Sequence, residues 1–387
     1  MRARRRLSGR RSWLGPRAPN HIYRRELTAV AHTAPFWSHP SEHYGGPLPD
    51  KAEIVIVGGG ITGVSLLYHL KKRRMRALLL ERGHLASGAS GRNAGFVLAG
   101  VADNYATAVG TYGRERAREI WGFTLENHDA VTSALKNVDV GHNRCGTVIL
   151  AASDAERVQL EESAELLTDD GFQAHFDGDV LYNPRDGEIN PTALVAALAR
   201  MAPDGSIHEH VNVTGLVAES KRVFVHVEDE TVEAGIVILA TNAWTSLLVP
   251  SVKISPRRAQ MLAMAPVDRV TVEKPTYSDF GYRYWRQLTS GVLLIGGWRN
   301  TSMETEETFD DKPTAAIQER IEAFARSELG ADTPVTHRWA GTMGFTEDGL
   351  PIVGPVEGMP HVFACAGYNG HGMGFAFLSA KKVIDSL

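Results

Sequence analysis

The sequence predicts an α/β region built on a Rossmann-like βαβ unit, joined to an α+β region with strands of its own. The first observation behind this prediction is a β-branched run at 53–57, followed by three glycines, an amphipathic stretch at 61–74 and an apolar run at 77–80. The second is a set of later strand-like runs before a glycine-rich segment and a final helix. With 387 residues, one large or two interleaved domains are expected.

Further helices and strands are predicted along the rest of the chain. Helices are predicted at 114–136, 154–169, 191–201 and 314–328 and after the glycine-rich segment 367–374. Strands are predicted at 147–151, 221–228, 231–239 and 361–365, with two more within 281–297 around Thr289-Ser290-Gly291. The small residues of 87–95 are expected to form a loop.

Composition narrows the class of protein. Apolar residues make up 43% and charged residues 22%, as in a typical globular protein, and the net charge of −4 does not favour a nucleic-acid partner. No apolar run reaches the roughly 18 residues that span a bilayer. The two cysteines, Cys145 and Cys365, exclude a disulfide framework and a cysteine-based metal site, and no metal is expected. They favour a reducing compartment, so the predicted location is the cytoplasm.

The N-terminal segment differs from the rest. Its first 25 residues carry nine arginines and no acid before Glu26. Residues 1–46 are predicted to be a disordered extension, or the result of a start codon assigned too early, with folded structure from about Pro47. An organellar transit peptide also fits the Arg-rich composition, whereas a twin-arginine export signal lacks an apolar region after Arg10-Arg11.

The residues 58–63 match the pattern G-x-G-x-x-G between the first strand and the first helix. Gly58 permits a tight turn, Gly60 lets the backbone approach a pyrophosphate, and Gly63 lets helix and strand pack closely. The helix N-terminus offers free N–H groups to phosphates. Glu81, at the end of the second strand, can accept hydrogen bonds from ribose hydroxyls and disfavours a 2′-phosphate.

This unit alone does not distinguish FAD from NAD, but three further segments do. The first is Ser87 to Gly95. The second combines Val213 with the later strand that ends in 240–244. The third consists of 348–354 followed by the glycine-rich 367–374. With them, residues 50–387 resemble the D-amino-acid oxidase superfamily of flavoproteins, nearest in motif to its γ-glutamylputrescine oxidoreductase branch. The resemblance implies an FAD-binding domain interleaved with an antiparallel-sheet substrate domain. The FAD-binding domain would comprise 47–100, 185–250 and 330–387, and the substrate domain 101–184 and 251–329.

The resemblance also implies a set of FAD-binding residues. Glu81 would bind the AMP ribose, Val213 would lie at the adenine, and the turn 370–374 would direct a helix N-terminus at the flavin N1/O2 edge. The full set is Gly58, Gly60, Ile61, Thr62, Gly63, Glu81, Arg82, Ser87, Ser90, Gly91, Arg92, Asn93, Val213, Ala240, Thr241, Trp244, Gly341, Gly370, His371, Gly372, Met373 and Gly374. Relatives with covalent flavin use a cysteine in the segment matching 341–345 or a histidine in that matching 90–93; neither residue is present, so the FAD is expected to be non-covalent.

The expected reaction takes a hydride from the carbon next to an amine nitrogen and gives an imine that hydrolyses. It needs no side-chain base, and the sequence shows no catalytic dyad. Strand alternation puts Tyr282, Tyr284 and Arg286 on one face, where Tyr284 and Arg286 could orient a substrate; the alternative is a surface strand with solvated arginines. Trp298-Arg299 is a second candidate, and His371 is expected either beside the flavin or in local hydrogen bonding.

One departure concerns substrate choice. Glycine oxidase-like members carry a carboxylate-binding arginine where this chain has Met343, which favours amines or longer amino compounds over simple amino acids. Lys274 could promote the reaction with oxygen or lie on the surface, and the electron acceptor is oxygen or an unidentified partner. Two alternatives remain: a flavin-bearing subunit of a larger electron-transfer dehydrogenase, and an NAD-dependent dehydrogenase.

Overall fold

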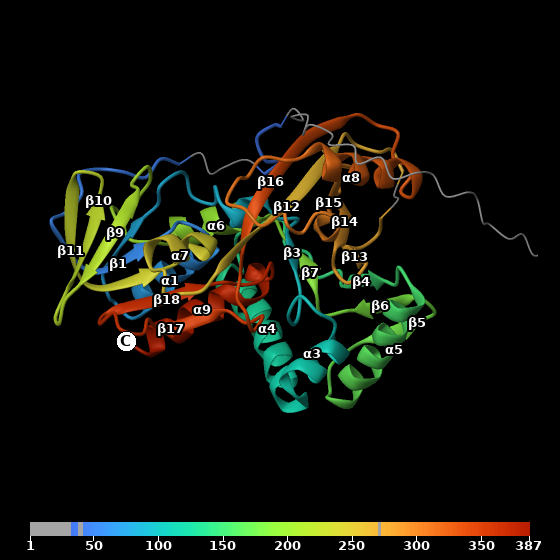
Figure 1. Cartoon of the computed structure of the whole chain (residues 1–387), viewed down its shortest axis with the longest axis horizontal. Coiled ribbons are helices and arrows are strands. Elements are labelled where there is room, and N and C mark those ends of the chain that lie inside the picture. The colour runs from blue at the N-terminus through green and yellow to red at the C-terminus, as the bar shows by residue number, and fades with distance from the viewer. Residues whose placement is uncertain (1–31, 38–41, 270–271) are drawn as a thin grey trace, which may run out of the picture.

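A computed structural model describes residues 32–37, 42–269 and 272–387 (Figure 1). Two eight-stranded sheets and a two-stranded ribbon make up its strands. In Figure 1 the first sheet lies on the left with the C-terminal helix beneath it, and the second extends down the right-hand side. Within the described part of the chain, no helix is long and apolar enough to cross a membrane.

The first sheet has a parallel centre in the order β18-β11-β1-β2-β8. The antiparallel β17 borders β18, and β9 and β10 form a hairpin extension on β11. The strands are β1 (Lys51–Val57), β2 (Ala77–Leu80), β8 (Ile207–His208), β9 (Val213–Ala218), β10 (Val223–Val227), β11 (Glu230–Leu239), β17 (Ile352–Pro355) and β18 (Val362–Ala366). Residues 54–57 are all buried, because a parallel sheet is covered on both faces.

Helices cover one face of this sheet and pack against each other. The first helix, α1 (Ile61–Lys72), contacts α9 (Gly372–Asp385) and α6 (Pro191–Arg200), and α9 also contacts the long helix α4 (Arg114–Ala134). Apolar side chains of all four helices form one buried cluster with Ile54 and Ile56. The first helix and the last helix therefore meet in a single core, which fixes the two glycine-rich turns relative to each other.

The second sheet is almost entirely antiparallel, in the order β16-β12-β15-β14-β13-β4-β6-β5, with β13 and β4 as the parallel exception. Its strands are β4 (Thr147–Leu150), β5 (His175–Asp177), β6 (Val180–Asn183), β12 (Ser255–Met264), β13 (Thr276–Ser278), β14 (Arg283–Gln287), β15 (Leu293–Gly297) and β16 (Val335–Phe345). Helix α8 (Ala315–Ser327) packs on β12 and β15, and α5 (Asp154–Asp169) packs on β6 and on α3 (Tyr105–Tyr112). The ribbon pairs β3 (Phe96–Val97) with β7 (Gly187–Glu188).

Three features of the chain differ from the sequence prediction. The strand β16 belongs to the second sheet, so this sheet continues to Phe345, beyond the domain boundary expected at 330. Within the expected loop 87–95, Ala89–Arg92 form the single-turn helix α2. Residues 32–37 fold onto the body although structure was expected only from Pro47: the Trp37 side chain is 6% exposed, and its indole N–H donates to the Asn93 carbonyl at 2.8 Å. The predictions for 1–31 lie outside the described residues.

Candidate functional site

A cavity of about 640 Å³ lies between the two sheets. Its walls come from the glycine turns after β1 and before α9, from the loop around α2, from the ends of β2 and β11, and from β13, β14 and β16. Such a volume is within the range of small-molecule and cofactor sites. The walls divide into a nucleotide-like end, a central part beside α2 and an aromatic end under the second sheet.

The turn after β1 has the geometry that its glycines predict. Gly58 has a φ of +110°, and a Cβ there would lie 2.7 Å from the Ala240 carbonyl oxygen. A Cβ on Gly63 would lie 1.9 Å from the Gly58 carbonyl oxygen, so helix and strand could not pack as they do with any larger residue. The sequence roles given to Gly58 and Gly63 agree with these contacts.

Glu81 closes the nucleotide-like end. Its carboxylate accepts hydrogen bonds from the backbone N–H groups of Gly59 at 2.6 Å and Gly83 at 2.8 Å, and it lines the cavity with Val213. Arg82 also lines this end, with its guanidinium over the Trp244 ring at 4.4 Å. A carboxylate held by two backbone donors is fixed in direction, as recognition of two vicinal ribose hydroxyls requires.

Two helix N-termini border the cavity, and at the first of them the Ile61 N–H donates to Ser90 Oγ at 2.9 Å. Neither Gly60, before α1, nor His371, before α9, caps its helix by a side-chain hydrogen bond, and neither first turn contains an acid. Residues of both turns line the cavity. The positive ends of two helix dipoles, with the other N–H groups of their first turns, suit an anionic pyrophosphate and an electron-rich ring edge. The residues present therefore fit FAD.

The central part is built around Arg92 on α2. Its guanidinium donates to the carbonyls of Ser87 at 2.7 Å and Ala340 at 2.8 Å, and it pairs with Asp311 at 2.9 Å. A Cβ on Gly341 would lie 2.9 Å from the Arg92 Cβ, so β16 and α2 approach as closely as a glycine allows. Arg92 thus joins the glycine loop, β16 and the segment around Asp311 at the middle of the cavity.

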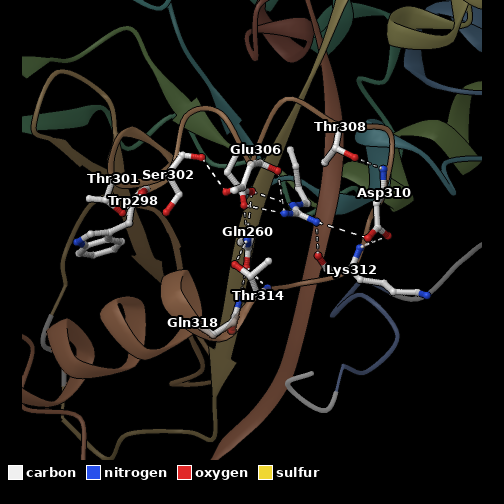
Figure 2. A network of polar contacts seen from close by, with 12 residues as sticks. Gln260, Trp298, Thr301, Ser302, Glu306, Thr308, Asp310, Lys312, Thr314 and Gln318 are labelled. Carbon is white, nitrogen blue, oxygen red and sulfur yellow. Dashed lines mark hydrogen bonds and ion pairs between the residues drawn. The ribbon is translucent and has the colours of Figure 1, made fainter. Parts of the chain in front are cut away.

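The segment 302–314 that carries Asp311 is fixed by a buried polar network (Figure 2). Arg258 on β12 pairs with Glu306 at 2.8 Å, and these side chains are 5% and 1% exposed. Gln260 donates to Glu306 at 3.0 Å and to Thr314 at 2.9 Å, as Figure 2 shows. Both ends of the segment are therefore tied to β12, which holds Asp311 against the cavity.

The aromatic end carries four tyrosine or phenylalanine rings from β13, β14 and the turn between them, and a fifth from β16. These residues are Tyr277, Phe280, Tyr282, Tyr284 and Phe345. Burial raises the pKa of Tyr284 to about 12 and raises the pKa of Tyr277 further, so both phenols stay protonated near neutral pH. They can donate hydrogen bonds to a bound substrate but are poor bases there.

Arg299 supplies the charge of this end. Its guanidinium carbon lies 4.7 Å from the Tyr282 ring centre and 4.9 Å from that of Phe345. Burial lowers its pKa from the usual value. No carboxylate among the described residues forms an ion pair with Arg299, whereas Arg92, Arg258 and Arg286 each have one. A partly buried cation without a protein anion can bind an anionic group.

His371 lies where the cavity meets a smaller one. Burial lowers the pKa of His371 to about 4, so the imidazole is neutral near pH 7. Its Nδ1 lies 3.5 Å from the Asn369 carbonyl oxygen, and its side chain borders both cavities. A neutral ring at the start of α9 leaves the helix N-terminus as the local source of positive potential.

The smaller cavity, of about 80 Å³, adjoins the aromatic end. Most of its walls are apolar, and the two cavities share Ala102, Tyr277, Phe280, Gly281 and His371. Asp186 lies in its wall and accepts hydrogen bonds from Thr147 Oγ1 at 2.6 Å and the Ala99 N–H at 2.9 Å. Burial raises the pKa of Asp186 to about 7.

Most residues of the predicted site line the main cavity. They are Gly58, Gly60, Ile61, Thr62, Glu81, Arg82, Ser87, Ser90, Arg92, Asn93, Val213, Ala240, Thr241, Trp244, Tyr284, Gly341, Gly370, His371, Gly372 and Met373. Gly63, Gly91 and Gly374 do not line it; each lies where a Cβ would meet a backbone oxygen at 2.6 Å or less. These three glycines serve packing behind the site.

Arg286 is not among the residues that line the cavity, which corrects the substrate role expected for it. Its Nη1 donates to the Gly95 carbonyl at 3.0 Å and the Ile189 carbonyl at 3.2 Å, and its Nε lies 3.4 Å from Glu188. These contacts lie at the ribbon of β3 and β7, so the side chain binds protein groups there and not a ligand in the cavity. Lys274 is likewise outside the cavity and donates to the Cys145 carbonyl at 2.9 Å.

The sequence prediction missed Tyr277 and Phe280 and ranked Arg299 second. Tyr277 lies in a strand of three residues, too short for a periodicity signal. Arg299 follows a glycine pair and Trp298, which has a φ of +61°. A non-glycine residue in that conformation is a frequent mark of a functional site, but the sequence does not reveal it.

Comparisons with known proteins cover most of the chain. The family model described as FAD dependent oxidoreductase (DAO) matches residues 53–386. The γ-glutamylputrescine oxidoreductase of Escherichia coli is 23% identical, over 87% of this chain and 83% of that protein. The 4-methylaminobutanoate oxidase (formaldehyde-forming) of Paenarthrobacter nicotinovorans is 28% identical over 88% of this chain, which spans 44% of that longer protein. The crystal structure of glycine oxidase from Geobacillus kaustophilus superposes with a TM-score of 0.74 at 21% identity, over 87% of this chain and 94% of that one.

Proposed function

Because the chain belongs to the DAO family of FAD-dependent oxidoreductases, we propose that it oxidises a small amine or amino acid at the carbon next to nitrogen. The observation that carries the proposal is the composition of one cavity, which joins an FAD-like cradle to an aromatic end with an unpaired arginine. We also propose a cytoplasmic location, which the two free cysteines favour.

When bound, FAD would supply the hydride acceptor, at flavin N5. We propose that it is held non-covalently, with Glu81 at the ribose, the α1 N-terminus at the pyrophosphate and the α9 N-terminus near the ring edge. The substrate loses a hydride and a proton to become an imine, and water then converts the imine to a carbonyl compound and an amine or ammonia. The protein's own task is to exclude bulk water and orient the C–H bond.

The aromatic end favours a substrate with an anionic group away from the reacting carbon. Arg299 would bind that group, and Tyr282 and Tyr284 would enclose the chain between it and the flavin. The names of two relatives describe substrates with an amine and a carboxylate, 4-methylaminobutanoate and γ-glutamylputrescine. This support is for the class of compound rather than for either molecule.

The proposal is tested by product analysis. The flavin-loaded protein is incubated in air with a panel of amines, N-methylated amines and amino acids, and the carbonyl product and released amine are measured. We expect equal amounts of both products from at least one compound of the panel. Equal amounts with an added dye but none in air would identify a dehydrogenase, and no product with any acceptor would contradict the proposal.

A further inference from the structure

The turn between β13 and β14 has an unusual backbone at the entrance of the aromatic end. Asp279, Phe280 and Gly281 have consecutive φ values of 56°, 53° and 78°. Two adjacent non-glycine residues in the left-handed region are rare and persist only where the surroundings hold them. The Phe280 side chain is also 43% exposed, although it is large and apolar.

Glu156 holds this turn. Its carboxylate accepts hydrogen bonds from the Phe280 N–H at 2.6 Å and the Asp279 N–H at 3.1 Å. It also accepts the Ala152 N–H at 2.7 Å, and the residue is 1% exposed. A buried carboxylate aimed at two successive N–H groups fixes the backbone of the turn, because an alternative conformation would leave the carboxylate unsatisfied.

A second contact joins the same turn to the residue after Arg299. The Asp279 carboxylate accepts a hydrogen bond from Asn300 at 3.1 Å and pairs with Arg283 at 3.2 Å. Hydrogen bonds therefore connect the turn at 279–281 to Glu156 on α5 and to Asn300, the residue after Arg299. These contacts hold the three segments together around the aromatic end.

Phe280 lies at the boundary of the two cavities, since it lines both. On its far side the space of about 80 Å³ is surrounded mainly by apolar side chains, including Leu98, Val101, Leu160 and Leu181. An alkyl chain that passed this boundary would find room and an apolar environment.

We propose that Phe280 sets the longest alkyl chain that the substrate site accepts, and that Glu156 is the positioning residue that holds Phe280 at the boundary. The inference rests on the proposed function for its substrate, but the position of the turn can be measured without turnover. Phe280 forms part of the wall between the two cavities, and Glu156 holds the backbone from which its side chain projects.

The first experiment removes the wall. Phe280→Ala is compared with the parent protein and with Val158→Ala, an exposed position on α5 that lines neither cavity. Anaerobic flavin reduction is followed with straight-chain amines and amino carboxylates of increasing length. We expect Phe280→Ala to raise kcat/KM for the longest compounds about tenfold relative to the shortest, since each accommodated methylene is worth about that factor. An unchanged length preference would overturn the inference.

The second experiment tests the clamp and needs no substrate. Hydrogen exchange of the Asp279 and Phe280 amides is measured in flavin-loaded Glu156→Gln and in Glu162→Gln, an exposed control on the same helix. We expect at least about tenfold faster exchange at the turn in Glu156→Gln alone, because one neutral oxygen replaces the charged acceptor. Equal exchange in both variants would overturn the positioning role. If no amine reduces the parent protein, the proposed function fails while this measurement still decides the clamp.

Discussion

The Arg299 guanidinium lies over the Tyr282 ring, with 4.7 Å between its central carbon and the ring centre. This contact holds the guanidinium in place without neutralising it, since an aromatic face attracts a cation but carries no net charge. The charge therefore remains available to a ligand in a cavity whose other end is built for a nucleotide.

Arg299→Met removes the charge from the aromatic end. We expect KM for an anion-bearing substrate to rise tenfold or more, because a lost charged contact costs about 1.5–3 kcal/mol. Arg116→Met, which removes an exposed arginine paired with Glu119, serves as the control. Steady-state kinetics on both variants with the same substrate measure the effect, and an unchanged KM in Arg299→Met would remove this residue from the site.

Arg286→Met should affect stability rather than substrate binding. The change leaves Glu188 and two carbonyls without their cationic partner in a region where the Arg286 side chain is 4% exposed. Breaking such a buried pair costs about 3 kcal/mol, which urea unfolding can resolve. A raised KM with unchanged unfolding would return Arg286 to the substrate site.

Gly60→Val should abolish FAD binding. Gly60 lines the cavity, and its Cβ would lie 2.8 Å from Ser90 Oγ, so a branched side chain would occupy the pyrophosphate space. Gly110→Val is the control for the loss of a glycine, since nothing lies within 4 Å of a Cβ at Gly110. The ratio of flavin to protein after purification is the measurement; a fully loaded Gly60→Val protein would refute the placement.

Asp186 makes the folded state sensitive to pH. Burial raises its pKa to about 7 from the usual 3.8, so the folded protein binds this proton more tightly than the unfolded chain does. The associated stability is fully present below the unfolded pKa and is lost as pH rises through about 7.

Asp186→Asn should therefore lose less stability than the parent protein as pH rises from about 5 to about 9, by about 2–3 kcal/mol. Melting temperatures across this range measure the difference, with the exposed Asp332→Asn as the control. Parallel pH curves for the parent protein and Asp186→Asn would show that Asp186 has an ordinary pKa.

The nucleotide-like half of the site could be predicted from the sequence because its signals are local. The turn at Gly58, the packing at Gly63 and the acid at Glu81 each depend on neighbours within one βαβ unit. The small residues near Ser90 and before α9 further indicated that the bound nucleotide is FAD and not NAD. Such motifs constrain backbone geometry directly, so a short stretch of sequence carries the whole signal.

The aromatic half could not be predicted as well, because it depends on contacts between distant segments. Alternation placed Tyr284 and Arg286 on one face, but only the contacts of Arg286 with the Gly95 and Ile189 carbonyls show that it is outside the cavity. The burial of Trp37 and its hydrogen bond to the Asn93 carbonyl could not be predicted either, since residues 32–37 show no helix or strand pattern. Strand β16 was not predicted as a strand, although this edge strand of the second sheet lines the cavity with Gly341, Thr342 and Met343.

The most direct test of the account is the visible spectrum of the purified protein before and after anaerobic addition of amines and amino acids. We predict the absorption bands of an oxidised flavin, released on denaturation because no covalent link is expected, and their bleaching by a compound that carries both an amine and an anionic group. A colourless protein that gains no colour with added FAD, or a flavin that no such compound bleaches, would contradict the account.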